Sequence, residues 1–107
     1  NDCVDTSSGK YFVSKLVLYG CEDKGVSVGE KSYFKLTNAE IKETNMALVS
    51  KDSSKLIVKN GFLQKNKVCA AAYNKKQEFG PSYISIPRKL CPINKLAIQN
   101  ISTLEVK

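Results

Sequence analysis

Four cysteines constrain the fold of this 107-residue chain more than any other feature: Cys3, Cys21, Cys69 and Cys91. No two of them form a C-x-x-C pair, and the chain contains no histidine. A structural zinc site brings its ligands in closely spaced pairs, so this pattern argues against zinc. An even number of cysteines in a short chain instead indicates two disulfides and an oxidising compartment. Closeness in sequence favours the pairs Cys3–Cys21 and Cys69–Cys91 over the other pairings.

The segment around Gly80 suggests how the second pair would form. Cys69 and Cys91 are equidistant from Gly80, which begins a Gly-Pro turn signal. The flanks 68–73 and 83–86 are short and rich in β-branched, aromatic and small apolar residues. Folding the segment back at Gly80 predicts a β-hairpin closed by a disulfide, and each such bridge would stabilise the fold by about 3 kcal/mol.

Strands are also predicted in the first part of the chain. Residues 10–20 are dense in β-branched and aromatic residues with apolar groups in both phases, which predicts a central strand covered on both sides. From 26 to 37 apolar and polar residues alternate as in a half-buried strand, with a break at Gly29 as an alternative. The capping-box spacing of Thr37 and Glu40 suggests a short helical turn over 39–44.

Two turn signals in the middle of the chain predict further hairpins. The polar run 51–55 would join arms on either side, and Asn60-Gly61 is a strong two-residue hairpin signal. Residues 64–77 fit either a strand or a helix, and their poor apolar stripe favours the strand. The tail after Lys95 also fits a strand better than a helix, and no internal repeat is evident.

Short strands with turns every 8–12 residues are typical of a small antiparallel β-sandwich or barrel. We therefore expect a mainly β fold stapled by two disulfides, with at most one short helix. An α+β fold with a helix near 64–77 is the alternative. The length predicts a single domain over residues 1–107. Since the chain starts at Asn1 without an apolar leader, we expect either a removed signal peptide or a domain cut from a larger protein.

The net charge of +7 is concentrated in the middle of the chain. Residues 51–77 hold seven lysines against Asp52 alone. Such a run is either a solvated face or a surface that meets something acidic, such as a glycan, a lipid or a protein patch.

Aromatic residues among these lysines mark candidate recognition surfaces. The first candidate is Tyr33, which stands between Lys31 and Lys35. The second is a lysine-rich group made of Lys55, Lys59, Phe62, Lys65, Lys67, Tyr73 and Lys75. Rings beside cations suit sugar stacking or a protein hot spot, whereas lysines that only protect strand edges are the alternative interpretation.

Catalysis is not expected. The absence of histidine removes the usual general base, and the sequence contains no nucleotide-binding or hydrolase motif. We therefore predict no catalytic residue, no cofactor and no metal. Arg88 is the one arginine, which argues against nucleic acid because arginine is the better reader of phosphates and base edges.

The resulting functional hypothesis is a secreted or cell-surface binding module. It would recognise an extracellular protein receptor or an acidic glycan through a Lys/Tyr-rich face, as a toxin or adhesin subunit does in host interaction. The alternative is a basic toxin or antimicrobial protein that acts directly on membranes. No apolar run has the roughly 20 residues of a membrane-spanning helix. An open sheet edge would permit oligomers, and Asn100-Ile-Ser has the form of a glycosylation acceptor.

Overall fold

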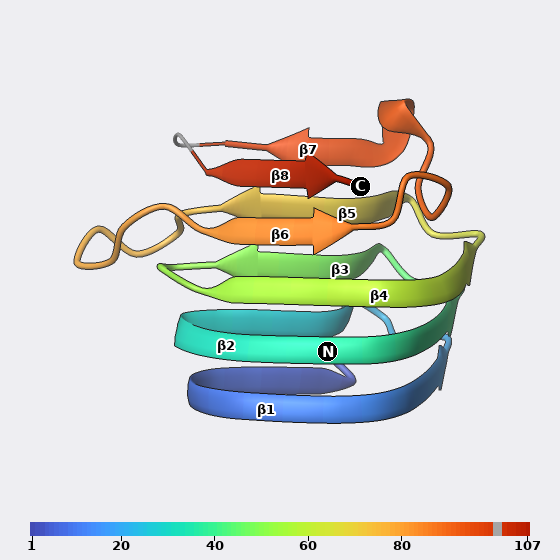
Figure 1. Cartoon of the computed structure of the whole chain (residues 1–107), viewed down its shortest axis with the longest axis horizontal. Coiled ribbons are helices and arrows are strands. Elements are labelled where there is room, and N and C mark those ends of the chain that lie inside the picture. The colour runs from blue at the N-terminus through green and yellow to red at the C-terminus, as the bar shows by residue number, and fades with distance from the viewer. Residues whose placement is uncertain (100–101) are drawn as a thin grey trace.

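The computed structural model describes residues 1–99 and 102–107 and shows a β-solenoid. The chain winds through successive coils that stack on one another, and the paired strands run parallel (Figure 1). The prediction of an antiparallel sandwich or barrel is therefore wrong, and so is the α+β alternative. The prediction of a mainly β chain is confirmed. The Asn-Ile-Ser triplet begins at Asn100, which lies outside the described residues.

Strands make up most of each coil. Their bounds are β1 Val4–Tyr19, β2 Lys24–Lys42, β3 Met46–Lys51, β4 Lys55–Gln64, β5 Val68–Tyr73, β6 Tyr83–Ile86, β7 Leu96–Ile98 and β8 Thr103–Val106, with a short 3-10 helix, η1, at Ile93–Lys95. In the described part of the chain, no helix has the length and apolar character that crossing a bilayer requires.

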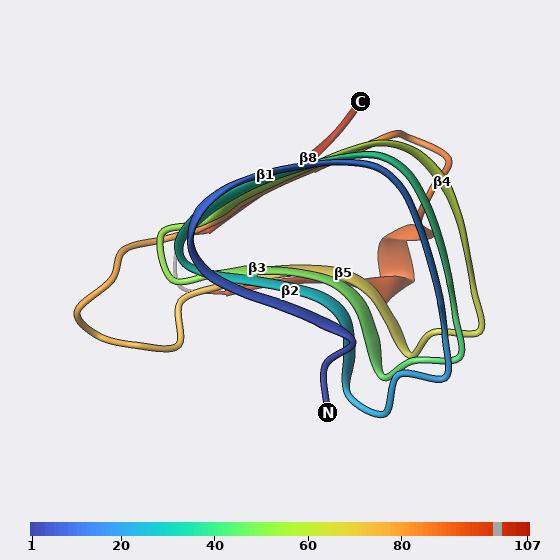
Figure 2. The same cartoon turned by 90° about the horizontal axis from the view of Figure 1, so that it is seen from below.

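The coils have three faces when viewed along the stack (Figure 2). The first face contains β3, β5, β7 and the beginnings of β1 and β2. The second face contains β6, β8, the middle of β1 and β2, and the beginning of β4. The third face contains the ends of β1, β2 and β4. β1 and β2 are long because each continues round the corners that interrupt the later coils.

A 22-residue repeat underlies the first four coils. Val4 lies opposite Val26, Val26 opposite Leu48, and Leu48 opposite Ala70, each 22 residues from the next. The expectation that the chain has no repeat is therefore wrong. What repeats is the inward position and not the residue type, and the loop 74–82 lengthens the fourth coil. The repeat is consequently hidden in the letters although it organises the fold, as in other solenoids.

The core fills the space between the three faces. Its inward side chains come from alternate positions of every strand, and they are almost completely buried in the central coils. Members of this core are Val26, Val28, Phe34, Leu36, Ala39, Ile41, Leu48, Leu56, Val58, Ala70, Ala72, Ile84 and Ile86. Burying such side chains contributes about 1.5–3 kcal/mol each for the larger ones, so the alternating pattern is the main driving force for coiling.

None of the three predicted hairpins is formed. The turn signals at Gly80 and at 51–55 are corners, and the strand after each corner pairs with the coil before it and not with the strand it follows. Asn60-Gly61 lies inside β4, opposite Asn38 and Ala39 of β2. A Cβ added to Gly61 would lie 2.4 Å from the Ala39 carbonyl oxygen, so this glycine allows two coils to approach closely.

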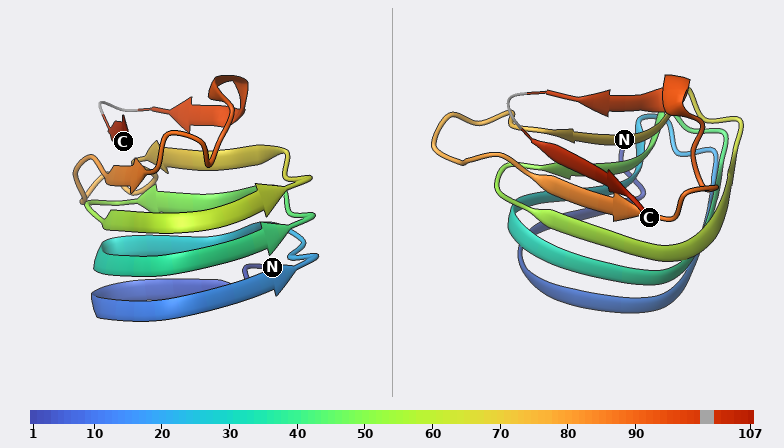
Figure 3. Two further views of the ribbon diagram at one scale, coloured as in Figure 1. Left: turned by 45° about the vertical axis from the view of Figure 1, so that its right-hand side comes forward. Right: turned by 45° about the horizontal axis from the view of Figure 1, so that its top comes forward.

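Several local predictions can be compared with these strands. The strands expected at 10–20, 26–37 and 68–73 are confirmed as parts of β1, β2 and β5. β1 is not central, however, because it pairs with β2 alone and forms one end of the stack (Figure 3). The expected helical turn over 39–44 is wrong, since β2 extends to Lys42.

One corner of the solenoid is stacked serine. The buried Ser32 donates its backbone N–H to the Ser54 hydroxyl oxygen at 3.1 Å, and Ser54 donates to the Ser82 hydroxyl at 3.3 Å. Ser82 donates in the same way to Ser102 at 3.0 Å. Small hydroxyls thus satisfy buried backbone donors from one coil to the next.

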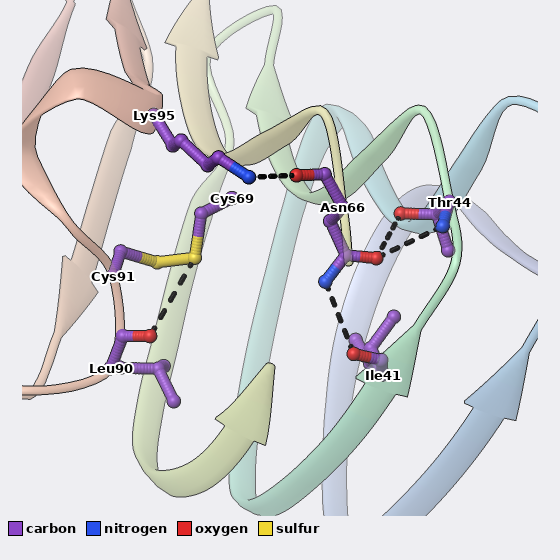
Figure 4. The surroundings of a disulfide bond; sticks show 7 residues. All are labelled: Ile41, Thr44, Asn66, Cys69, Leu90, Cys91 and Lys95. Atoms are coloured by element: carbon purple, nitrogen blue, oxygen red, sulfur yellow. Dashed lines mark hydrogen bonds between the residues drawn. A yellow bond between two sulfur atoms is a disulfide. The ribbon is translucent and has the colours of Figure 1, made fainter. Parts of the chain in front are cut away.

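Asn66 organises a second corner (Figure 4). Its buried side-chain oxygen accepts the backbone N–H of Thr44 at 3.0 Å and the Thr44 hydroxyl at 2.7 Å, while its amide donates to the Ile41 carbonyl at 3.1 Å. The Lys95 ammonium donates to the Asn66 carbonyl at 3.0 Å. This residue therefore joins the second coil, the third coil and η1.

The two disulfides pair Cys3 with Cys21 and Cys69 with Cys91, as predicted. The hairpin reasoning behind the second pair is wrong, because β5 and β6 lie on different faces. Each bridge instead joins the beginning and the end of one coil, with a Cα–Cα distance of 5.7 Å in both cases. Cys69 and Cys91 are buried beside the carbonyl of Leu90 (Figure 4). Two such bridges are compatible with an oxidising compartment.

Candidate functional site

A column of lysines and tyrosines crosses the second face. Lys10, Tyr33, Lys55, Tyr83 and Thr103 lie opposite one another in successive coils. Each points outward because the next residue along its strand belongs to the core phase. Neighbouring strands are about 4.8 Å apart, so cation and ring alternate at that spacing. We call this column and the column that begins at Phe12 the Lys/Tyr face.

The second column of the Lys/Tyr face is Phe12, Lys35, Ile57, Ser85 and Glu105. Phe12 is 69% exposed, and its ring centre lies 5.9 Å from that of Tyr33. The two columns therefore place exposed and half-buried rings among lysines on one sheet surface.

Electrostatics leave this face positive. Glu105 is its one acidic group in the described residues, and it accepts the Tyr83 hydroxyl at 2.5 Å and lies 3.3 Å from the Lys107 ammonium. The hydrogen bond from Tyr83, followed by that from Lys107, lowers the pKa of Glu105. The hydrogen bond to Glu105 in turn raises the pKa of Tyr83. Glu105 is thus neutralised locally.

The lysines of the two columns have no such partner. Within residues 1–99 and 102–107, no carboxylate forms an ion pair with Lys10, Lys35 or Lys55. The Lys55 ammonium lies 5.1 Å above the Tyr83 ring centre, which orients it without cancelling its charge. These cations are available to an acidic ligand.

Two shallow hollows lie along the edge where the second face meets the third. The first, of about 200 Å³, is lined by Phe12, Val13, Ser14, Lys35 and Thr37. The second, of about 270 Å³, is lined by Ile57, Val58, Lys59, Ser85, Ile86, Pro87 and Lys107.

The structure brings together only part of the predicted site. Tyr33, Lys35 and Lys55 lie on the Lys/Tyr face, and Lys59 lies at its edge. Lys31 is exposed at the serine corner, with a left-handed φ of 66°.

The remaining predicted residues lie elsewhere. Phe62 is on the third face, where the Lys42 ammonium lies 5.3 Å from the ring centres of both Phe62 and Tyr19. Tyr73 is half-buried on the outer side of the first face, and burial raises the pKa of its phenol. Lys75 is in the loop 74–82.

Lys65 and Lys67 lie at the corner between the third and first faces. They line a hollow of about 520 Å³ together with Glu22 and Glu43. Its charge is mixed, so this hollow is less suited to an anion than the Lys/Tyr face.

A polar pocket of about 210 Å³ lies at the corner of the first and second faces and is lined in part by Glu30, Asp52 and Lys76. Lys76 and the Ser7 hydroxyl donate to Glu30. These two hydrogen bonds, that from Lys76 first, lower the pKa of Glu30. Asp52 is fully buried and accepts backbone N–H groups of the loop 74–82. The charges here pair with one another and hold the loop.

Three residues of the Lys/Tyr face were missed in the sequence: Lys10, Phe12 and Tyr83. Each lies far along the chain from Lys35 and Lys55, so a local pattern does not connect them. The 22-residue repeat is the signal that would have aligned Lys10 with Tyr33 and Lys55. Tyr83 needs the further knowledge that the loop 74–82 is an insertion.

Among the described residues, no cluster of three or more Cys, Asp or Glu has the arrangement of a metal site. Comparison of the chain with protein-family models, with curated proteins and with solved structures found no match.

Proposed function

We propose that this protein is a non-catalytic binding module that recognises an acidic glycan through the Lys/Tyr face. The observation that carries the proposal is the column Lys10, Tyr33, Lys55 and Tyr83, in which cations and rings alternate from coil to coil. Lysines attract carboxylate or sulfate groups, and the faces of aromatic rings pack against sugar rings. A parallel sheet holds both kinds of group at a regular spacing without a deep cleft.

The disulfides support a location outside the reducing cytosol. A glycan-binding module at a cell surface or in a secreted protein would meet its ligand in such a compartment, where disulfides persist. The proposal therefore combines the chemistry of the face with the oxidised state of all four cysteines.

The test is binding to immobilised acidic and neutral polysaccharides. We expect binding to heparin and polygalacturonate, weakening with salt, and none to dextran. Lys10→Ala with Lys55→Ala should weaken binding by about tenfold for each charged hydrogen bond lost. Lys65→Ala with Lys67→Ala is the charge-matched control and should change the affinity little. Binding to neither acidic polymer would refute the proposal.

Direct action on membranes is the competing function, because the protein is basic and Phe12, Val17, Tyr19 and Phe62 are exposed. Dye release from anionic vesicles tests it. Release at micromolar protein without acidic-polysaccharide binding would favour the membrane function over the glycan function.

A further inference from the structure

The two hollows at the edge of the Lys/Tyr face form one groove. Lys35 lines the first hollow and Ile57 lines the second, and these residues are direct partners across β2 and β4. The groove therefore continues from Phe12 in the first coil to Pro87 and Lys107 beyond the ends of β6 and β8. It runs across the strands, parallel to the axis of the stack.

The walls of the groove are positive and its floor is partly apolar. Lys35, Lys59 and Lys107 line it in successive parts, and Phe12 and Ile57 supply apolar surface. Glu105 is the acidic group nearby, and Tyr83 and Lys107 already occupy its oxygens. Lys35 and Lys59 have no ion-pair partner within the described residues.

We infer that this groove holds a linear anionic polysaccharide laid along the solenoid axis, with its carboxylate or sulfate groups at Lys35 and Lys59. This inference rests on the proposed function and adds the shape and direction of the ligand. A peptide strand or a flat ring would need only a few residues of one coil. A groove that crosses all the coils suits a chain molecule.

The length of the groove sets the size of the ligand. Five coils are separated by four rungs, which at about 4.8 Å each give a length of about 19 Å. An extended sugar residue is about as long as one rung, so about four sugars fill the groove.

The test measures the affinity of the full chain for heparin and oligogalacturonate fragments of defined length by titration calorimetry. We expect the affinity to rise from the disaccharide to about the tetrasaccharide and then to level off with one fragment bound per protein. Disaccharides that bind as tightly as longer fragments would overturn the axial arrangement but leave the proposed function standing. Failure of every fragment and of the parent polymers would overturn both.

Paired variants locate the ligand. Lys35→Ala with Lys59→Ala should lower tetrasaccharide affinity by about tenfold or more. Lys65→Ala with Lys67→Ala removes the same charge at a different corner and should change it less than twofold. Equal losses from the two pairs would indicate attraction by net charge alone and would overturn the groove. Loss with Lys10→Ala and Lys55→Ala but not with Lys35→Ala and Lys59→Ala would also overturn it, while supporting the face as a whole. Circular dichroism confirms that each variant is folded.

Discussion

The carboxylate of Asp52 accepts the backbone N–H of Lys75 at 2.7 Å, across a corner of the solenoid. The same oxygen accepts the N–H of Lys76 at 2.8 Å, and the Asp52 side chain is fully buried. The loop 74–82 is further held by Ser53, which accepts the Gly80 N–H with its hydroxyl at 2.5 Å. A long surface insertion is thereby fastened to the coil below it.

Replacing Asp52 should loosen this loop. Asp52→Ala removes the acceptor from two donors and places alanine at a left-handed φ of 54°, so we expect a loss of about 2–3 kcal/mol in the free energy of unfolding. Asp52→Asn keeps one oxygen and tolerates this backbone, so its loss should be about 1 kcal/mol. Urea denaturation measures both, with the exposed Glu22→Gln as control. Unchanged hydrogen exchange at Lys75 and Lys76 in Asp52→Ala would contradict this account.

The disulfides should each contribute separately to stability. Replacing Cys69 and Cys91 by serine, or Cys3 and Cys21 by serine, should cost about 3 kcal/mol, because each bridge closes a loop of about 20 residues. The two bridges should differ in where their loss is felt. Without Cys3–Cys21, hydrogen exchange should rise mainly in β1, which pairs with β2 alone. Uniform exchange throughout the chain would argue against this end-coil role.

Two glycines provide a matched test of coil packing. The Cβ of Gly61→Ala would lie 2.4 Å from a backbone oxygen of the neighbouring coil, and we expect a loss of about 1–3 kcal/mol or more as the strands shift apart. At Gly80 the nearest atom would be 3.4 Å away, an ordinary contact. Gly80→Ala should therefore be nearly neutral. Thermal and urea unfolding of both variants checks the difference, and equal effects would refute close coil approach at Gly61.

The Glu30–Lys76 pair should give a measurable dependence on pH. Hydrogen bonds from Lys76 and Ser7 lower the pKa of Glu30 in the folded state. Its contribution to stability is therefore present above the unfolded pKa and is lost as the pH falls through the folded pKa. Carbon NMR titration should show Glu30 titrating below an ordinary glutamate. Lys76→Met should return the pKa towards that of an ordinary glutamate, and a titration unaffected by this change would contradict the pairing.

The amino-acid order alone was enough to predict the extended character of this chain and its oxidised cysteines. Alternating apolar residues in 26–37 and the β-branched run in 10–20 are local signals, since they depend on which side of one strand is buried. The pairing of Cys69 with Cys91 followed from closeness in sequence, although the hairpin offered as its reason is absent. Tyr33 beside Lys35 was likewise visible without a fold.

Strand partners and direction emerged only in the folded coils. Alternation tells which side chains are buried, but the same alternation fits an antiparallel neighbour across a turn and a parallel neighbour 22 residues away. Gly80 and Asn60-Gly61 have the composition of hairpin turns, yet one lies at a corner and the other lies within β4 because burial of the core requires coiling. The alignment of Lys10, Tyr33 and Lys55 exists only through that stacking. Long-range register, which the core packing sets, is the physical reason that the candidate face could not be predicted from local patterns.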